Sequence, residues 1–413
     1  MTLIKTSILT AISTIIKVIS AFVINKVIAI YVGPSGLAVV GQLQNFMSIA
    51  TTFSNGAITQ GVIKYTAEYK TIEQKQKIFS TSIVISLICS LIISLFLFGM
   101  SDYLSEKILK DSKYSNVFVV FSLTIFLFAL NTILMSILNG QKEIKKYILV
   151  NIASSIFALF FTSFLIMQLN LIGALYALVV NQSVIFFVTL AFVVKSSWFK
   201  LEYFKHGVDK ESLLKLSKFS LMAITSAITV PASHLIVRNY IGENLSWDDA
   251  GYWQAIWYIS SMYLMVVTTS LSVYYLPRLS EIQDNSELKK EILDGYKLIL
   301  PIVSTLALGI YIFREFAIEI AFTEKFMPMI ELFKWQLIGD VIKISAWLLS
   351  YVMLAKAMTR EFIYTEVFFS VSFVILSVIF IDRFGLVGIT YAYSVNYFIY
   401  LLIMIFIFKR KFG

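Results

Sequence analysis

Cysteine, histidine and proline are scarce in this sequence of 413 residues, which has one cysteine, two histidines and five prolines. The lone Cys89 cannot form an intrachain disulfide bond or, by itself, a metal site, and we expect it to be a small buried apolar residue. The sequence also lacks a phosphate-binding loop, a paired-cysteine motif and an HExxH motif. We therefore predict no metal, no cofactor, no catalytic residue and no ATP-driven step.

Charge is scarce too, because 14% of the residues are charged whereas 58% are hydrophobic, and the mean hydropathy is +0.82. These values are typical of a membrane protein, and apolar runs of about 20 residues, enough for a spanning helix, recur along the chain. Helices rather than barrel strands follow from the length of these runs. The predicted fold class is all-α, with twelve transmembrane helices at 8–31, 37–63, 78–99, 116–138, 147–168, 171–194, 212–237, 251–276, 296–313, 328–355, 362–381 and 386–408.

Lysine and arginine are concentrated in alternate loops. The basic loops lie around residues 70–77, 142–146, 195–218, 278–297 and 356–360, with a basic end at 409–411, whereas the intervening loops are more acidic. Because basic loops remain in the cytoplasm, we predict that both termini are cytoplasmic. This topology accounts for most of the net charge of +9, so we expect no nucleic-acid partner.

The chain divides into two similar halves at its longest polar connection, residues 195–218. The stretch "LIGALYALVVN" at 171–181 aligns without gaps on "LVGITYAYSVN" at 386–396, and each opens the last predicted span of its half. Six spans per half make the halves parallel repeats, which enclose a cavity between two bundles. We predict two six-helix lobes, 1–199 and 200–413, around a central cavity.

Ionisable side chains occur within the predicted spans or at their ends, at Lys17, Lys26, Lys64, His234, Arg238, Asp340 and Lys343. A charge at the bilayer centre costs about 2.5–3.5 kcal/mol on insertion scales, so such groups favour a wet cavity. Asn45, Asn55 and Gln60 add polar groups at helical spacing in the second span. We predict a hydrophilic, net positive cavity whose substrate-binding residues are Lys17, Lys26, Asn45, Asn55, Gln60, Lys64, Arg238, Asp340 and Lys343.

Several of these residues also have a purely structural interpretation. Lys26 lies about 180° around an ideal helix from Lys17, and Lys64 lies near a membrane end, so either could instead reach the lipid headgroups. Asp340 and Lys343, three residues apart, could form a structural ion pair.

Two residues of the seventh span have a possible role in a transport cycle. His234 could be a satisfied polar residue or a proton relay. Pro231 removes a backbone donor, kinks the seventh span and could act as a gate or be static.

Lysine and arginine without a catalytic set favour an anionic ligand, most naturally a phosphate or pyrophosphate. The amide, hydroxyl and aromatic side chains suit sugars. The stretches "YVGPSGLAVVGQLQNF" (31–46), "SKFSLMAITSAITVPASHLIVRNYI" (217–241) and "EKFMPMIELFKWQLIGDVIKI" (324–344) resemble the Wzx-type flippases, in the branch of the O-antigen translocases and lipid III flippases.

This resemblance implies the fold of the multidrug/oligosaccharidyl-lipid/polysaccharide (MOP) exporters and a location in the bacterial inner membrane. It also implies that undecaprenyl-pyrophosphate-linked oligosaccharide moves from the cytoplasmic to the periplasmic leaflet by alternating access. Membrane lipids and the periplasmic polymerisation machinery are the further partners expected.

Two other functions stay open at this point. A drug or cation exporter of the same superfamily would be expected to have an acidic cavity, whereas Asp340 is the one clear intramembrane acid here. A membrane-bound glycosyltransferase or ligase would need a larger outer loop or a carboxylate motif. The sequence does not define the sugar, the energy source or the oligomeric state.

Overall fold

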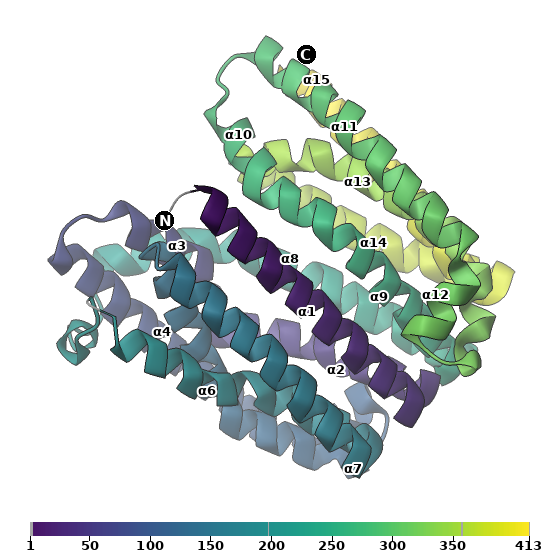
Figure 1. Ribbon diagram of the computed structural model, residues 1–413, viewed down its shortest axis with the longest axis horizontal. Helices are drawn as coiled ribbons and strands as arrows, with labels where there is room; N and C mark the ends of the chain where they lie inside the picture. The colour runs from purple at the N-terminus through teal and green to yellow at the C-terminus, as the bar shows by residue number, and fades with distance from the viewer. Residues whose placement is uncertain (1–2, 197, 357, 413) are drawn as a thin grey trace. The chain divides into compact units, whose positions relative to one another are not determined.

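The computed structural model describes residues 3–196, 198–356 and 358–412, and within these ranges every regular element is a helix (Figure 1). The predicted all-α fold class is confirmed. Among these residues, segments long and apolar enough to cross a membrane lie at Ile12–Tyr31, Ile72–Gly99, Ser112–Gly140, Ile144–Val194, Asn285–Ile312, Glu324–Ala355 and Thr359–Phe412. The count of twelve spans stays a prediction.

Two of these segments are too long for a single crossing, because they contain 51 and 54 residues. Helices of that length would extend about 75–80 Å, against about 30 Å of hydrocarbon. Both are interrupted at matching positions of the internal repeat. Within α7 (Ile144–Val194), Asn170 has φ 53° and ψ −130°. Between α14 (Thr359–Phe384) and α15 (Gly388–Phe412), Gly385 has φ 63° and ψ −148°.

The glycines shared by the two repeats lie just after these interruptions. A Cβ atom on Gly173 would lie 2.0 Å from the carbonyl oxygen of Leu165, and one on Gly388 would lie 2.1 Å from that of Phe380. Only glycine permits such close approach of two backbone segments. The repeated sequence therefore encodes the same tight reversal of the chain in each half.

The described residues form two compact units. Unit 1 comprises the residues up to 32 and residues 39–231, and unit 2 comprises residues 33–38 and the residues from 232 onward. In unit 1, α7 packs against α1 (Leu3–Tyr31) and α6 (Ser115–Gly140), and α6 also packs against α3 (Thr59–Glu68) and α4 (Ile72–Gly99). In unit 2, α13 (Phe333–Ala355) packs against α11 (Asn285–Ile312), α14 and α15.

The long polar connection is attached to unit 1. The Ser80 hydroxyl donates a hydrogen bond to the Gly207 carbonyl oxygen (2.8 Å), and the Asp209 amide donates to Thr81 Oγ1 (3.0 Å). The next helix, α8 (Lys210–Asn244), is divided between the units after Pro231. The assignment of functional lobes to 1–199 and 200–413 stays a prediction.

The predicted span 37–63 is not one continuous helix. Helix α2 (Gly33–Ser54) ends before a short break, and α3 begins at Thr59. Within the break, Gly56 and Ala57 have φ values of 63° and 55°. Positive φ interrupts helical hydrogen bonding, and an alanine in this region depends on the surrounding packing to hold it there.

Candidate functional site

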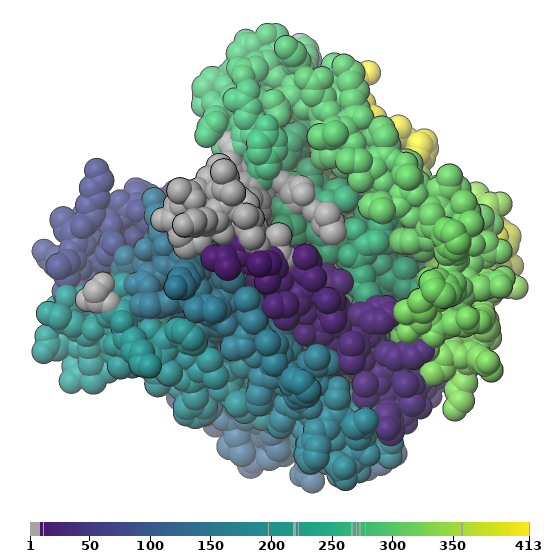
Figure 2. Space-filling model, in the orientation of Figure 1, coloured from purple at the N-terminus to yellow at the C-terminus, as the bar shows by residue number. Residues whose placement is uncertain are grey.

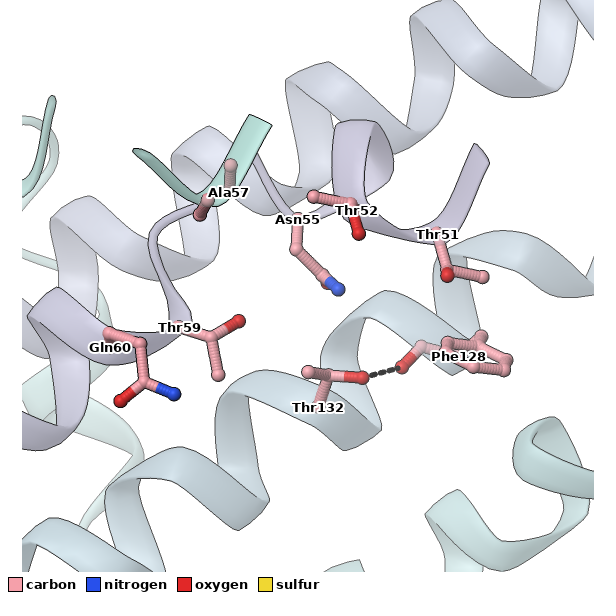
Figure 3. Close-up of a pocket in the computed structure, with 9 residues that line it drawn as sticks. Thr51, Thr52, Asn55, Ala57, Thr59, Gln60, Phe128 and Thr132 are labelled. Carbon is pink, nitrogen blue, oxygen red and sulfur yellow. Dashed lines mark hydrogen bonds between the residues drawn. The ribbon is translucent and has the colours of Figure 1, made fainter. Parts of the chain in front are cut away.

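The break between α2 and α3 opens onto a polar pocket of about 300 Å³ within unit 1. Its polar lining comes from Thr51, Thr52, Asn55, Thr59, Gln60 and Thr132. Figure 3 shows Asn55 projecting from the break toward α6, which carries Thr132. The structure thus brings together two predicted site residues, Asn55 and Gln60, and among the described residues no lysine or arginine lines this pocket.

Three hydroxyl groups of this pocket are arranged to accept hydrogen bonds. Thr51, Thr52 and Thr132 each donate their single hydroxyl hydrogen to a carbonyl oxygen of their own helix, at 2.7, 2.9 and 3.0 Å. Only their oxygen lone pairs remain for a ligand. Asn55 Oδ1 is buried and has no hydrogen-bond partner among the described residues. Ligand hydroxyl groups, which both donate and accept, fit these threonine oxygens together with the amide groups of Asn55 and Gln60.

The predicted cationic residues of unit 1 lie outside that pocket's lining. Lys17 is exposed and Lys26 half-buried on α1, whose purple side chains are visible on the face shown in Figure 2. Lys64 is exposed on α3, with its Nζ 5.3 Å from the centre of the Tyr65 ring. Asn45 is half-buried on α2. Their role in substrate binding stays a prediction.

A second set of predicted residues is buried together in unit 2. Arg238 on α8 is 1% exposed, donates a hydrogen bond to Gln254 of α9 (Trp247–Ser270), and lies 5.3 Å from the centre of the Trp253 ring. His234, one turn earlier, contacts the rings of Trp253 and Trp257 at 5.3 and 4.8 Å. The cation and the imidazole are therefore held against the same aromatic surface of α9.

Asp340 on α13 is fully buried, and each of its oxygens accepts hydrogen bonds from hydroxyl groups. Ser260 and Tyr263 of α9 donate to Oδ2 at 2.7 and 2.9 Å, and Tyr393 of α15 donates to Oδ1 at 2.8 Å. Three hydroxyl donors satisfy a buried carboxylate without a cation.

Lys343 does not pair with Asp340, although the two residues are three positions apart. No ion pair between them exists in this part of the described chain. The Lys343 ammonium lies instead 5.0, 4.8 and 5.7 Å from the ring centres of Trp257, Trp347 and Tyr397. The two side chains therefore make no direct ion pair, although their opposite charges lie close enough to interact, and cation–π contacts of up to about 2 kcal/mol each surround the lysine.

The structure adds one acidic residue that the sequence analysis missed. Glu366 lies on α14 inside the predicted span 362–381 and is hydrogen-bonded to the hydroxyl of Tyr400. The statement that Asp340 is the one clear intramembrane acid is thus wrong. The position of Glu366 between apolar residues was the signal that could have identified it.

Comparison with known proteins identifies the family to which this chain belongs. The model of a family described as "Polysaccharide biosynthesis protein" matches residues 27–331, which is well over half of the chain. The chain belongs to that family. The matched region includes Asn55, Gln60 and Arg238, and ends before Asp340.

Two relatives extend the comparison over nearly the whole length. The lipid III flippases of Escherichia coli and Shigella flexneri are each 28% identical over 403 residues, covering 97% of this chain and 96% of theirs. These similarities confirm the family resemblance stated from the sequence.

Solved structures show the same fold. An inward-facing multidrug resistance MATE family transporter of the MOP superfamily superposes with a TM-score of 0.80 at 14% identity, covering 95% of both chains. The lipid II flippase MurJ in an inward closed conformation gives 0.71 at 20% identity, covering 98% of this chain and 87% of that one. The MOP fold predicted from the sequence is confirmed, and the protein is a multi-pass membrane protein.

Proposed function

We propose that this family member is a flippase that moves an undecaprenyl-pyrophosphate-linked oligosaccharide from the cytoplasmic to the periplasmic leaflet of the bacterial inner membrane. The observation that carries the proposal is the similarity to lipid III flippases over 97% of the chain. It supports a transporter of a lipid-linked oligosaccharide rather than an enzyme. The predicted topology, with both termini in the cytoplasm, belongs to the same proposal.

Each unit, taken by itself, offers groups that suit one part of such a headgroup. The acceptor oxygens around Asn55 suit glycan hydroxyl groups, whereas the diphosphate requires cations such as Lys17, Lys26 and Lys64. In unit 2, Arg238 and Lys343 provide further positive charge beside the hydroxyl-bound Asp340.

Alternating access would expose this headgroup first to one side of the membrane and then to the other. Pro231 lies inside α8, where it leaves the Ala227 carbonyl without its helical donor, and we assign it to the gating movement. A proton-relay role for His234 stays a prediction.

Reconstitution in liposomes tests the proposal. The purified protein is incorporated with a labelled undecaprenyl-pyrophosphate oligosaccharide, and the label that becomes accessible in the opposite leaflet is measured. We expect Lys17→Ala, Lys26→Ala and Arg238→Ala each to slow flipping, while Lys200→Ala, an exposed lysine of the polar connection, leaves it unchanged.

Undiminished flipping in all three folded variants would remove these cationic residues from the mechanism but leave the flippase function standing. Movement of a cationic dye by the wild type without movement of the oligosaccharide would overturn the proposed function and favour the drug exporter.

A further inference from the structure

An apolar groove of about 670 Å³ lies between α11, α13 and α15 in unit 2, away from the cluster around Asp340. Ile292, Leu293, Tyr296 and Leu300 line it from α11 at the spacing of one helical face. Leu349 of α13, with Leu401, Ile405 and Phe408 of α15, complete its apolar wall. The groove therefore presents a continuous hydrocarbon surface.

Polar atoms inside the groove are already satisfied by the protein. The Tyr296 hydroxyl donates to the carbonyl oxygen of Ser345 at 2.6 Å, and the Ser345 hydroxyl donates to that of Val341 at 2.9 Å. Neither hydroxyl hydrogen is left for a ligand. A ligand therefore gains most binding free energy by burying an aliphatic chain in the groove.

One end of the groove is cationic. Lys289 lies near the start of α11 and Lys409 near the end of α15, and both line the groove. The neighbouring carboxylates form ion pairs with other cations. Glu287 and Glu291 pair with Arg278, and Glu361 pairs with Lys411. Among the described residues, Lys289 and Lys409 form no ion pair. Two uncompensated ammonium groups beside an apolar groove complement an anionic headgroup joined to an aliphatic tail.

The length of the groove matches one leaflet. Its lining on α11 runs from Lys289 to Leu300, which corresponds to about 17 Å of helix. Half of the hydrocarbon layer is about 15 Å thick. A membrane phospholipid, whose acyl chains fill a single leaflet, fits this length.

We propose that this groove binds an anionic phospholipid of the surrounding membrane, with its phosphate between Lys289 and Lys409 and an acyl chain along α11 and α15. Basic pockets between transmembrane helices commonly bind acidic lipid headgroups. The site is separate from the substrate site proposed above, so each proposal can fail without the other.

Native mass spectrometry measures this binding without transport. The full-length protein in detergent is titrated with phosphatidylglycerol and, separately, with phosphatidylcholine of identical acyl chains. We expect the wild type to bind phosphatidylglycerol in preference to phosphatidylcholine. Each lysine near a headgroup contributes about 1 kcal/mol, so Lys289→Gln with Lys409→Gln is expected to weaken phosphatidylglycerol binding about 30-fold.

Two matched variants serve as controls. Lys290→Gln removes the adjacent exposed lysine, which does not line the groove, and Lys334→Gln removes a lysine that lines a separate pocket between α11 and α13. Both should bind phosphatidylglycerol like the wild type. Leu293→Trp, at a position 58% exposed and therefore tolerant of a larger ring, should weaken binding of both phospholipids by filling the groove.

Three outcomes would overturn the proposal. The first is equal binding of the two phospholipids by the wild type, and the second is an equal loss in the control variants. The third is stronger binding of undecaprenyl phosphate than of phosphatidylglycerol, which would assign the groove to the carrier lipid instead.

Discussion

The carboxylate of Asp340 shows how a single buried residue can join three helices, since it accepts hydroxyl hydrogens from α9 and α15 while lying on α13. Asp340→Ala would leave these donors without an acceptor in a site closed to water, and we expect it to lower the stability of the protein by about 2–4 kcal/mol. Asp340→Asn keeps one acceptor oxygen and should cost less than half as much. Thermal unfolding in detergent measures both.

The matched control is Asp382, which accepts a hydrogen bond from Tyr240 but is exposed. Water replaces a lost partner there, so Asp382→Ala should change the stability by less than about 0.5 kcal/mol. Equal melting temperatures for Asp340→Ala and the wild type would contradict the buried network.

A substitution at Lys343 distinguishes the effect of its buried charge on stability from its effect on transport. Its ammonium is enclosed by aromatic rings and makes no direct contact with a carboxylate in the described part of the chain, so Lys343→Met should keep the packing and remove the cost of burying a charge. We expect a melting temperature equal to or above that of the wild type, together with loss of flipping in the liposome assay. Full activity of this stable variant would exclude Lys343 from substrate binding.

At the scale of helices, the chain reverses direction in the same way in both halves, but a different residue lies at the reversal in each half. Asn170 and Gly385 occupy equivalent positions with φ 53° and 63°, a region that glycine enters without strain and other residues do not. Asn170→Gly is expected to stabilise the protein by about 1 kcal/mol, and Gly385→Asn to destabilise it by a similar amount or more. Melting temperatures measured side by side test the pair, and shifts of the same sign would refute the equivalence.

Helices and repeats could be predicted from the sequence wherever a local pattern of residues specifies them. Apolar runs indicated the helices, and the repeated "LIG" and "LVG" stretches indicated equivalent spans in two similar halves. The break after Ser54 was missed because Ala57 has positive φ through tertiary packing rather than through its own preference.

The partners of the buried charges could not be predicted for a related reason. Helical spacing placed Asp340 and Lys343 on one face, but apart from Trp347 on the same helix their contacts come from α9 and α15, far away in the sequence. Local spacing describes neighbours within a helix and contains no information about which other helix lies opposite.

At the scale of the whole molecule, the distribution of charge among the loops predicts its orientation in the membrane. The sole cysteine, Cys89, makes this testable, since Cys89→Ala provides a background free of thiols. New cysteines at exposed loop positions then report their side of the membrane through a reagent that does not cross it. Glu106→Cys and Glu243→Cys should react in intact cells, because we expect both loops in the periplasm.

Two positions in basic loops are the matched counterparts. Lys205→Cys lies in the polar connection after α7 and Gln283→Cys lies just before α11, and both side chains are exposed. We expect them to react only after the membrane is permeabilised. The predicted topology requires the same labelling pattern in both halves, because parallel repeats of six spans each begin on the same side of the membrane. Labelling of Lys205→Cys in intact cells would reverse the orientation and, with it, the proposed direction of transport.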